Sequence, residues 1–400
     1  MFSDTDTAWH LATGDLIRQL GHLPLYDSWS FTAGHYPWLN TAWGWDVICS
    51  FLLEHFSWQG LIVGNGIILA LTFACIFTSC FLRTNHVLAS LLTIILLQTM
   101  INIYIRPHQI SYLMTALMTL MFTLVHEGKC SKNWLLLCPA LVVIWVNMHG
   151  GFLMVLPLLA AFSAEKLLER DWRMVRFMAL VSSLCLLACL LNPYGIHIMD
   201  AVIRSFTSED KNFILEWKSP IPYREPMFFL YIVFFSACLL LPKIPTRPWE
   251  AILGGFWMLL GLLAWRHFGI FVIVSAPVIA MGVDTLLQPA GEKKPRHPRL
   301  QALRTATVRL ASYKTSLVGT ALCAVFVSVW LFTSSAKAFY AHSDTSPLWP
   351  DLSQEIAFLH THYPQARILN HYGLGAALVS ESRGQVPAFF RWQDMGSLST

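Results

Sequence analysis

Long apolar runs alternate with short polar segments along most of the chain. A helix needs about 20 apolar residues to cross the hydrocarbon core of a bilayer, and ten runs approach or reach that length. They cover residues 58–81, 87–104, 110–125, 134–148, 152–164, 174–191, 227–241, 249–265, 268–287 and 316–332. Because the apolar residues are continuous and do not alternate with polar ones, the pattern predicts an all-α polytopic membrane protein and disfavours a membrane β-barrel.

The composition agrees with a membrane protein. Hydrophobic residues make up 55% of the chain and charged residues only 12%, whereas soluble domains average about 25% charged residues. This excludes an ordinary cytosolic enzyme, and it excludes a disordered chain, which needs low hydrophobicity and high charge. The net charge of +4 is too small to indicate a nucleic acid partner.

The runs 134–148 and 152–164 are short, and only a polar segment around His149 separates them. They form either one broken helix or two helices joined by a tight turn. The two-helix choice, with residues 1–57 outside, places most of the 27 Lys and Arg in inner loops and leaves only Arg18 in the outer segment 1–57. Cytoplasmic loops carry an excess of Lys and Arg, so we expect two helices.

The chain divides into five segments on this topology. We expect an outer amphipathic loop with a helix over 8–20, a transmembrane bundle, a basic cytoplasmic linker, a last transmembrane helix, and an incomplete outer C-terminal domain. Their bounds are 1–57, 58–288, 289–314, 315–335 and 336–400. The last segment predicts a helix over 352–362 and short strands over 367–370 and 376–380, and therefore a small α/β unit.

Polar groups at the predicted helix ends gather on the outer side, while the inner side holds only loops with Lys and Arg, which membrane anchoring alone explains. They occupy 4–6, 106–108, 147–151, 192–195, 216–217 and 266–267. A transporter would carry polar groups near the bilayer midplane. The distribution therefore favours an enzyme that works at the outer face.

The acidic residues near the N-terminus are the candidate catalytic groups. A carboxylate of Asp4 or Asp6 at the membrane surface can take a proton from an acceptor hydroxyl. Acids at a helix N-terminus are also favoured by the helix dipole alone, and spacing does not decide between the two. His10 lies four residues after Asp6, on the same face of a helix that begins near Asp6, and Asp27 adds a further carboxylate.

Four cationic or titratable side chains stand at helix ends on the acidic outer side: Arg106, His108, Arg266 and His267. Positive-inside statistics disfavour this placement. Either they bind a phosphate, which Arg holds with its planar fork, or they extend to the lipid headgroups. His149 stands between small residues, where a packed, hydrogen-bonded histidine is commoner than a ligand.

Several segments resemble a bacterial family of GT-C-type integral-membrane glycosyltransferase-like proteins. This family is distantly related to the protein mannosyltransferases and to the lipid A aminoarabinose transferase. The similar segments are 4–14, 24–31, 37–40, 147–151, 192–195, 216–217 and 367–378. The resemblance implies a GT-C-like bundle of about ten transmembrane helices.

The resemblance also implies a reaction. Such enzymes take a sugar from a polyprenyl-phosphate carrier and pass it, with inversion, to an acceptor on the outer face. The catalytic carboxylate lies in the first outer loop, here Asp6 or, second, Asp4, and Arg106 and Arg266 would hold the leaving phosphate. The remaining candidate substrate-binding residues are His10, Asp27, His108, His149, Glu216 and His267.

The implied partners are membrane lipid, a lipid-linked sugar donor and a glycan, lipid or protein acceptor, in a bacterial inner membrane. No cofactor is certain, and a divalent metal ion is possible. The family has a transmembrane helix before the acidic segment, which begins here at residue 4, so we expect an apolar span upstream or a shortened chain. The alternatives are a non-catalytic scaffold or lipid-binding protein of envelope assembly and, third, a transporter or flippase.

Overall fold

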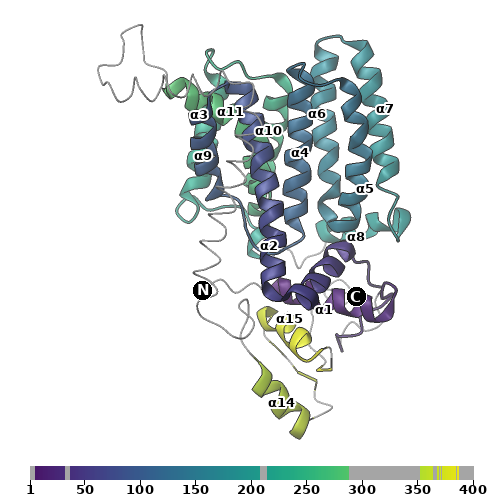
Figure 1. Ribbon diagram of the computed structural model, residues 1–400. Coiled ribbons are helices and arrows are strands. Elements are labelled where there is room, and N and C mark those ends of the chain that lie inside the picture. The colour runs from purple at the N-terminus through teal and green to yellow at the C-terminus, as the bar shows by residue number, and fades with distance from the viewer. Residues whose placement is uncertain are drawn as a thin grey trace.

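A computed structural model describes residues 5–31, 37–207, 214–287, 352–363, 367–368, 370, 372–383 and 385–386. The described chain is a bundle of apolar helices with a layer of short helices across one end (Figure 1). We name this end, where α1 and α15 lie, the α1 end. The expected linker 289–314 and the expected last span 316–332 lie outside the described residues, as does Asp4.

The bundle is built from α2 to α7 and α9 to α11. Their bounds are Trp43–Thr84 (α2), Val87–Gln98 (α3), His108–His126 (α4), Cys138–Met148 (α5), Val155–Leu168 (α6), Trp172–Ala188 (α7), Pro226–Leu240 (α9), Pro248–Leu263 (α10) and Phe268–Leu287 (α11). The shorter helices are Thr5–Leu20 (α1), Ile198–Thr207 (α8), Ser353–His362 (α14) and Tyr372–Glu381 (α15). Single 3-10 turns cover Lys132–Leu137 (η1), Gly150–Met154 (η2), Gly195–His197 (η3), Leu215–Trp217 (η5) and Trp265–His267 (η6).

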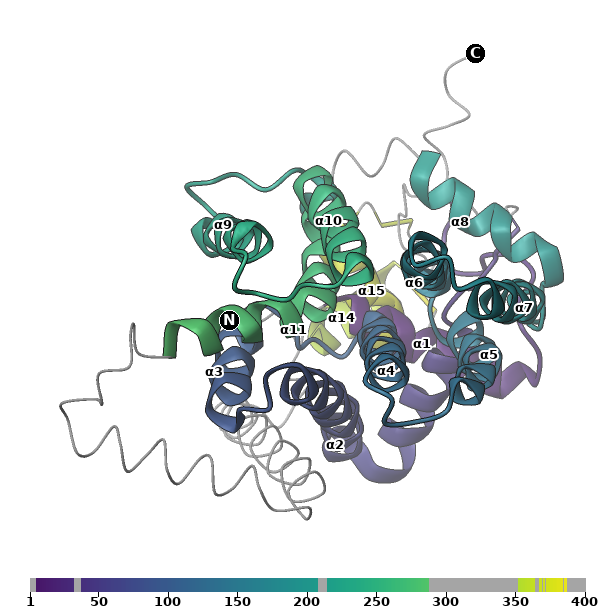
Figure 2. The same cartoon turned by 90° about the horizontal axis from the view of Figure 1, so that it is seen from above.

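Helix α11 is the centre of the bundle. It packs against α2, α3, α4, α9 and α10, with α9 and α10 on one side of the molecule and α5, α6 and α7 on the other (Figure 2). Its side chains from Phe268 to Gly282 are all buried. The continuous apolar run 268–287 therefore forms a helix that is surrounded by protein.

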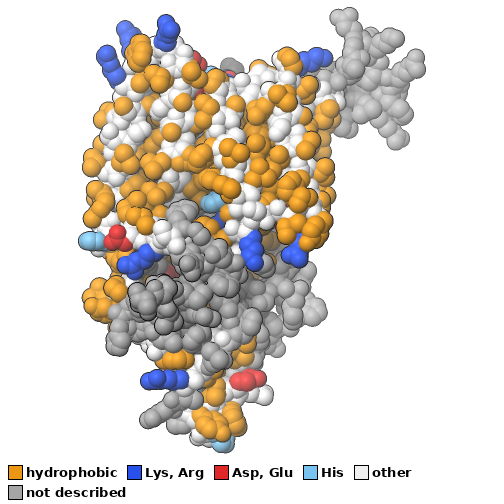
Figure 3. All heavy atoms as spheres, turned by 180° about the vertical axis from the view of Figure 1, so that it is seen from behind, with side chains coloured by type: hydrophobic (Ala, Val, Ile, Leu, Met, Phe, Trp, Pro, Cys, Tyr) orange, Lys and Arg blue, Asp and Glu red, His pale blue; other side chains and the backbone are white. Residues whose placement is uncertain are grey.

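The bundle is that of an integral membrane protein. Within the described residues, four helical stretches are long and apolar enough to cross a membrane: Trp43–Thr84, His108–His126, Gly150–Leu168 and Trp265–Leu287. Hydrophobic side chains cover the length of the bundle on the face shown in Figure 3, and Lys and Arg lie toward its two ends. The predicted all-α polytopic architecture is confirmed.

The two short runs form two helices joined by a tight turn. His149 is extended between α5 and η2, with a φ of −162° and a ψ of 138°. It contacts Ser111 near the start of α4, whereas Glu165 near the end of α6 contacts His126 at the end of α4. Helix α6 therefore runs in the same direction as α4 and opposite to α5, which is the two-helix arrangement that the distribution of basic residues predicted.

The run 87–104 forms a shorter helix than expected. Helix α3 ends at Gln98, and the chain continues as a loop to α4. The amide of Gln109 donates hydrogen bonds to the backbone carbonyls of Asn102 and Tyr104 at 2.7 and 2.9 Å. A buried side chain thus satisfies carbonyl groups that a longer helix would have used internally.

Helix α1 meets the start of α2 backbone to backbone. A Cβ atom on Gly14 would overlap the carbonyl oxygen of Asp46. Helix α2 is itself two helices joined at Ser57, which has a φ of 55° and a ψ of −163°. The part before Ser57 crosses α1, and the part after it belongs to the bundle. Helix α1 begins at Thr5, earlier than predicted, because Thr7 donates to the carbonyl of Ile105 at 3.0 Å.

The C-terminal segment differs from the prediction. Helix α14 confirms the helix expected over 352–362, but 376–380, expected as a strand, lies inside helix α15. The described residues of 352–386 contain no strand. Helix α15 packs against α1, and Val379 is fully buried against an aromatic cluster that includes Trp9 and Trp29. Packing against the rest of the protein therefore overrides the local preference of residues 376–380 for a strand.

We predict that Gly14→Ala destabilises the protein by about 1–3 kcal/mol, the usual cost of overpacking, because the added methyl group pushes α1 away from α2. Gly255→Ala in α10 is the matched control, since a Cβ there meets nothing within 4 Å, and alanine favours a helix. Thermal unfolding in detergent measures both. Equal melting temperatures for Gly14→Ala and wild type would refute the close contact.

Candidate functional site

A cavity of about 270 Å³ lies at the α1 end of the bundle. It is walled by the α3–α4 loop, α4, the α5–η2 turn, η5 and the start of α11. Its polar lining includes His108, Tyr112, His149, Glu216 and Arg266, and Met100, Met154 and Phe268 are among its apolar side chains. Four of the residues that the sequence singled out therefore line one cavity.

Arg106 stands beside this cavity and joins two carboxylates. Its Nη1 lies 3.0 Å from Oδ2 of Asp6 on α1 and 3.0 Å from Oε1 of Glu216. Its guanidinium also lies over the ring of Tyr104, 5.4 Å from the centroid. Because Glu216 lines the cavity, these contacts place Asp6 next to it, as the catalytic reading of Asp6 requires.

Arg266 has no ion pair with any described residue, in contrast to Arg106. Its guanidinium lies 4.1 Å from the ring centroid of Trp217, within the distance of a cation–π contact. The Arg266 side chain remains exposed to solvent, although many protein atoms lie near it. An arginine that is stacked on an indole and lines a cavity can bind an anion with both arms of its fork.

His149 is a neutral hydrogen-bonding group. Its Nδ1 accepts from the backbone N–H of Gly151 at 3.2 Å and from the hydroxyl of Ser111 at 2.6 Å. Nε2 therefore carries the proton in the neutral ring. Burial, followed by the charge of Arg266, lowers the pKa of His149 to about 3. The cavity thus has a hydrogen-bonding histidine that adds no charge at neutral pH.

His10 pairs with a carboxylate that sequence reasoning missed. Its Nδ1 lies 2.6 Å from Oδ1 of Asp46, which is only 1% exposed. Oδ2 of Asp46 accepts from the side-chain amide of Asn40 at 2.7 Å. The only signal in the sequence is a single acid between Trp45 and Val47, near the start of a long apolar stretch.

Asp27 and His267, two other predicted site residues, make contacts that hold the fold together. Oδ1 of Asp27 accepts from the backbone N–H groups of Trp29 and Ser30 at 2.8 and 3.1 Å, so this carboxylate holds a turn. His267 is buried beside Trp217 and Trp257, with ring centroids 6.4 and 5.8 Å away. Neither side chain is part of the cavity lining, whereas Asp4 lies outside the described residues.

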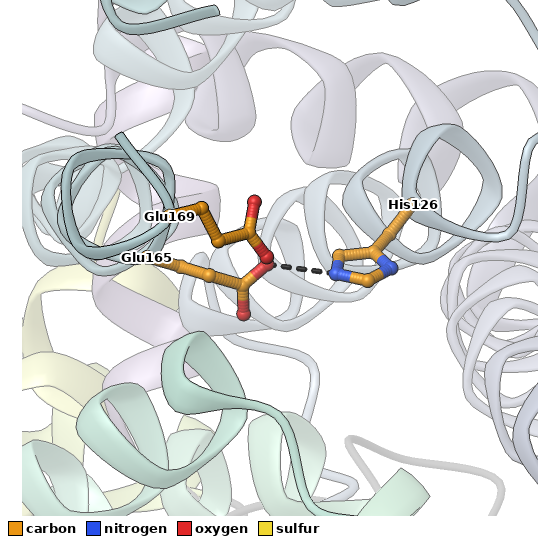
Figure 4. Close-up of side chains that lie close together, drawn as sticks. All are labelled: His126, Glu165 and Glu169. Atoms are coloured by element: carbon orange, nitrogen blue, oxygen red, sulfur yellow. Dashed lines mark ion pairs between the residues drawn. The ribbon is translucent and has the colours of Figure 1, made fainter. Parts of the chain in front are cut away.

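One group of described side chains has the composition of a metal site: His126, Glu165 and Glu169 (Figure 4). It lies at the far end of α4 from the cavity. The ammonium of Lys166 is 2.9 Å from Glu165 and 2.8 Å from Glu169, so it holds the position that a cation would take. These residues fit an ion-pair network and do not fit a metal centre that serves the cavity.

Comparison with known proteins identifies the fold. No family model and no curated protein sequence matches the chain. A crystal structure of ArnT from Cupriavidus metallidurans bound to undecaprenyl phosphate matches with a TM-score of 0.52 and 12% sequence identity, over 98% of this chain and 82% of that one. ArnT is a GT-C lipid A aminoarabinose transferase. At this identity the similarity concerns the fold, and the chain has the GT-C-like polytopic membrane fold that its sequence resemblance predicted.

Proposed function

We propose that this chain is a glycosyltransferase that moves a sugar from a polyprenyl-phosphate carrier to an envelope acceptor, at the outer face of a bacterial inner membrane. The observation that carries the proposal is the cavity at the α1 end. There, Arg266 has no carboxylate partner among the described residues, and the Asp6–Arg106–Glu216 cluster lies beside it. The match to an ArnT structure that holds undecaprenyl phosphate supports the same donor class.

Arg266 is the proposed phosphate-binding group. Its fork matches two phosphate oxygens, and His149 can donate from Nε2 without adding charge. Met100 and Phe268 give the cavity apolar walls for the first isoprene units of the carrier. When the bond between sugar and phosphate breaks, negative charge grows on the phosphate, and a cation already in place stabilises that charge.

Asp6 is the proposed catalytic carboxylate. Its carboxylate is held in place by Arg106, and a carboxylate can accept the hydrogen of an acceptor hydroxyl. The hydroxyl oxygen then attacks the anomeric carbon from the side opposite the phosphate, which leaves with the bonding electron pair. This displacement inverts the anomeric centre. Arg106 is held by two carboxylates, and its role is to place Asp6 and Glu216 at the phosphate end of the donor.

We predict that Asp6→Asn lowers transfer by 10²- to 10⁴-fold, the usual cost of losing a general base, because an amide cannot take a proton at neutral pH. The measurement is movement of radiolabelled sugar from polyprenyl-phosphate lipid to envelope material, with protein levels matched by blot. Asp15→Asn is the control, since Asp15 lies on the same helix but is exposed. Wild-type transfer by Asp6→Asn would favour a non-catalytic scaffold.

Arg266→Ala should raise the KM for the polyprenyl-phosphate donor and lower kcat, together by about tenfold or more, because a charge-assisted hydrogen bond contributes about 1.5–3 kcal/mol. Arg266→Lys keeps the charge but loses the fork, so its KM and kcat should lie between those of the wild type and those of Arg266→Ala. Steady-state kinetics with varied donor concentration give both constants. The exposed Arg224, replaced by Ala, should behave as wild type. An unchanged donor KM in Arg266→Ala would count against a phosphate at this position.

The outer placement of the cavity predicts a labelling pattern. A cysteine at exposed position 197, near the α1 end, should react with an impermeant maleimide added to intact spheroplasts. A cysteine at exposed position 173, near the start of α7 at the opposite end, should react only after the membrane is permeabilised. The reverse pattern would place the cavity on the cytoplasmic side.

A further inference from the structure

The carboxylate of Asp46 is buried and is directed at His10. Both of its oxygens are used, Oδ1 by His10 at 2.6 Å and Oδ2 by Asn40 at 2.7 Å. Asn40 is itself oriented, because its Oδ1 accepts from the backbone N–H of Ala42 at 2.9 Å. Burying a carboxylate costs several kcal/mol unless it is paired and hydrogen-bonded. This fully satisfied arrangement therefore holds one ring in one orientation.

The contact decides which ring nitrogen of His10 can act as a base. A carboxylate accepts, so Nδ1 must donate to Asp46. In the neutral ring Nε2 then has the lone pair and can accept a proton. The charge of Asp46 stabilises the imidazolium that results, as the aspartate does in a Ser–His–Asp triad. The pair therefore has the geometry of a proton acceptor.

His10 lies close to both parts of the proposed site. It is one turn after Asp6 on the same face of α1, a spacing that puts Cβ atoms about 6 Å apart. It is also near enough to His149 for its charge to contribute, after burial and Arg266, to the lowered pKa of His149. His10 thus lies on the face of α1 that carries the proposed catalytic carboxylate, within electrostatic range of a residue that lines the cavity.

Asp6 alone does not account for where the proton of the acceptor hydroxyl finally goes. A carboxylic acid ordinarily releases its proton well below neutral pH, so a carboxyl group such as that of Asp6 passes on a proton that it has taken. A proton taken from the acceptor hydroxyl therefore needs a second group that holds it more strongly. Within the described part of α1 and its contacts, the His10–Asp46 pair meets this requirement.

We propose that His10 is the final acceptor of the proton lost by the sugar acceptor, and that Asp46 is the positioning residue that holds His10 for this task. The inference rests on the proposed function. The acceptor oxygen forms its bond to the anomeric carbon, and the bond from that carbon to the phosphate oxygen breaks with both electrons leaving on the phosphate. The hydroxyl proton passes through Asp6 to Nε2 of His10 and is later released to water.

The charges around His10 set the sign of the pH dependence. Helix α2 presents Asp46 to it, while Glu54 of the same stretch pairs with Arg18. Glu381, the acid at the end of α15, accepts from the backbone N–H of Leu352 at 3.0 Å. Asp46 and Asp6 favour the protonated ring, and only the neutral ring can accept a proton. Transfer should therefore rise with pH through the titration of His10 and level off above it.

The decisive variant is His10→Asn, with kcat measured between about pH 5 and 8.5 in membrane vesicles whose polyprenyl-phosphate lipids carry radiolabelled sugar. The asparagine amide can still donate to Asp46 from the position of Nδ1, so the fold is kept, but nothing replaces Nε2. We expect the acid limb of the profile to disappear and kcat at high pH to fall by about 10²-fold or more. The exposed His22, replaced by Asn, is the control and should keep the wild-type profile.

Asp46→Asn provides a second reading, which decides the matter if His10→Asn does not fold. Losing the negative charge should move the acid limb to lower pH by about one unit or more, a displacement that a structural role alone would not produce. A wild-type limb in both variants, with transfer still abolished by Asp6→Asn, would overturn this inference and leave the proposed function standing. Transfer that is insensitive to Asp6→Asn and His10→Asn alike would overturn both.

Discussion

The contact between α1 and the start of α2 determines where the polar groups of this protein meet. Gly14 has no side chain, so the backbone of Asp46 lies directly against α1. That approach lets the side chain of Asp46 reach His10, one turn back along the helix. One further turn back, Asp6 reaches Arg106. A single close contact between backbones therefore aligns a face of α1 with the cavity, although α1 is far in sequence from the α3–α4 loop and η5.

The two arginines of the site differ in a way that residue type alone does not reveal. Arg106 lies between two carboxylates and is neutralised locally, whereas Arg266 stacks on Trp217 and has no carboxylate partner in the described structure. Arg266 is therefore the arginine whose guanidinium no described carboxylate occupies, although the charge of Glu216 also acts on it. At the opposite end of α4, by contrast, the charges are already paired, because Lys166 forms ion pairs with Glu165 and Glu169. A charged side chain at these two sites indicates a ligand only where it lacks an ion-pair partner of its own.

The sequence predicted the helices well because continuous apolar runs of membrane length admit few other structures. The turn at His149 followed from the distribution of basic residues, and the cations at 106 and 266 stood out because their expected outer placement opposes the positive-inside tendency. Side-chain pairing was beyond reach, since the partners of Arg106 come from α1 and η5. Asp27 was a candidate by composition and proved to hold a turn, while the pairing of Asp46 with His10 depends on how closely α1 approaches α2. The strand expected over 376–380 is a helix instead, because these residues pack against α1 and an aromatic cluster that the local sequence does not reveal.

Binding of a polyprenyl phosphate at Arg266 is the central claim, and a thermal-shift comparison tests it most directly. The purified protein in detergent would be titrated with undecaprenyl phosphate and, separately, with undecaprenol, which has the same chain but no phosphate. A ligand that binds the folded state at 100 times its Kd adds about 2.7 kcal/mol of stability. The account predicts a saturable rise in Tm with the phosphate, a much smaller rise with the alcohol, and loss of the difference in Arg266→Ala. Equal shifts with both lipids in the wild-type protein would contradict it.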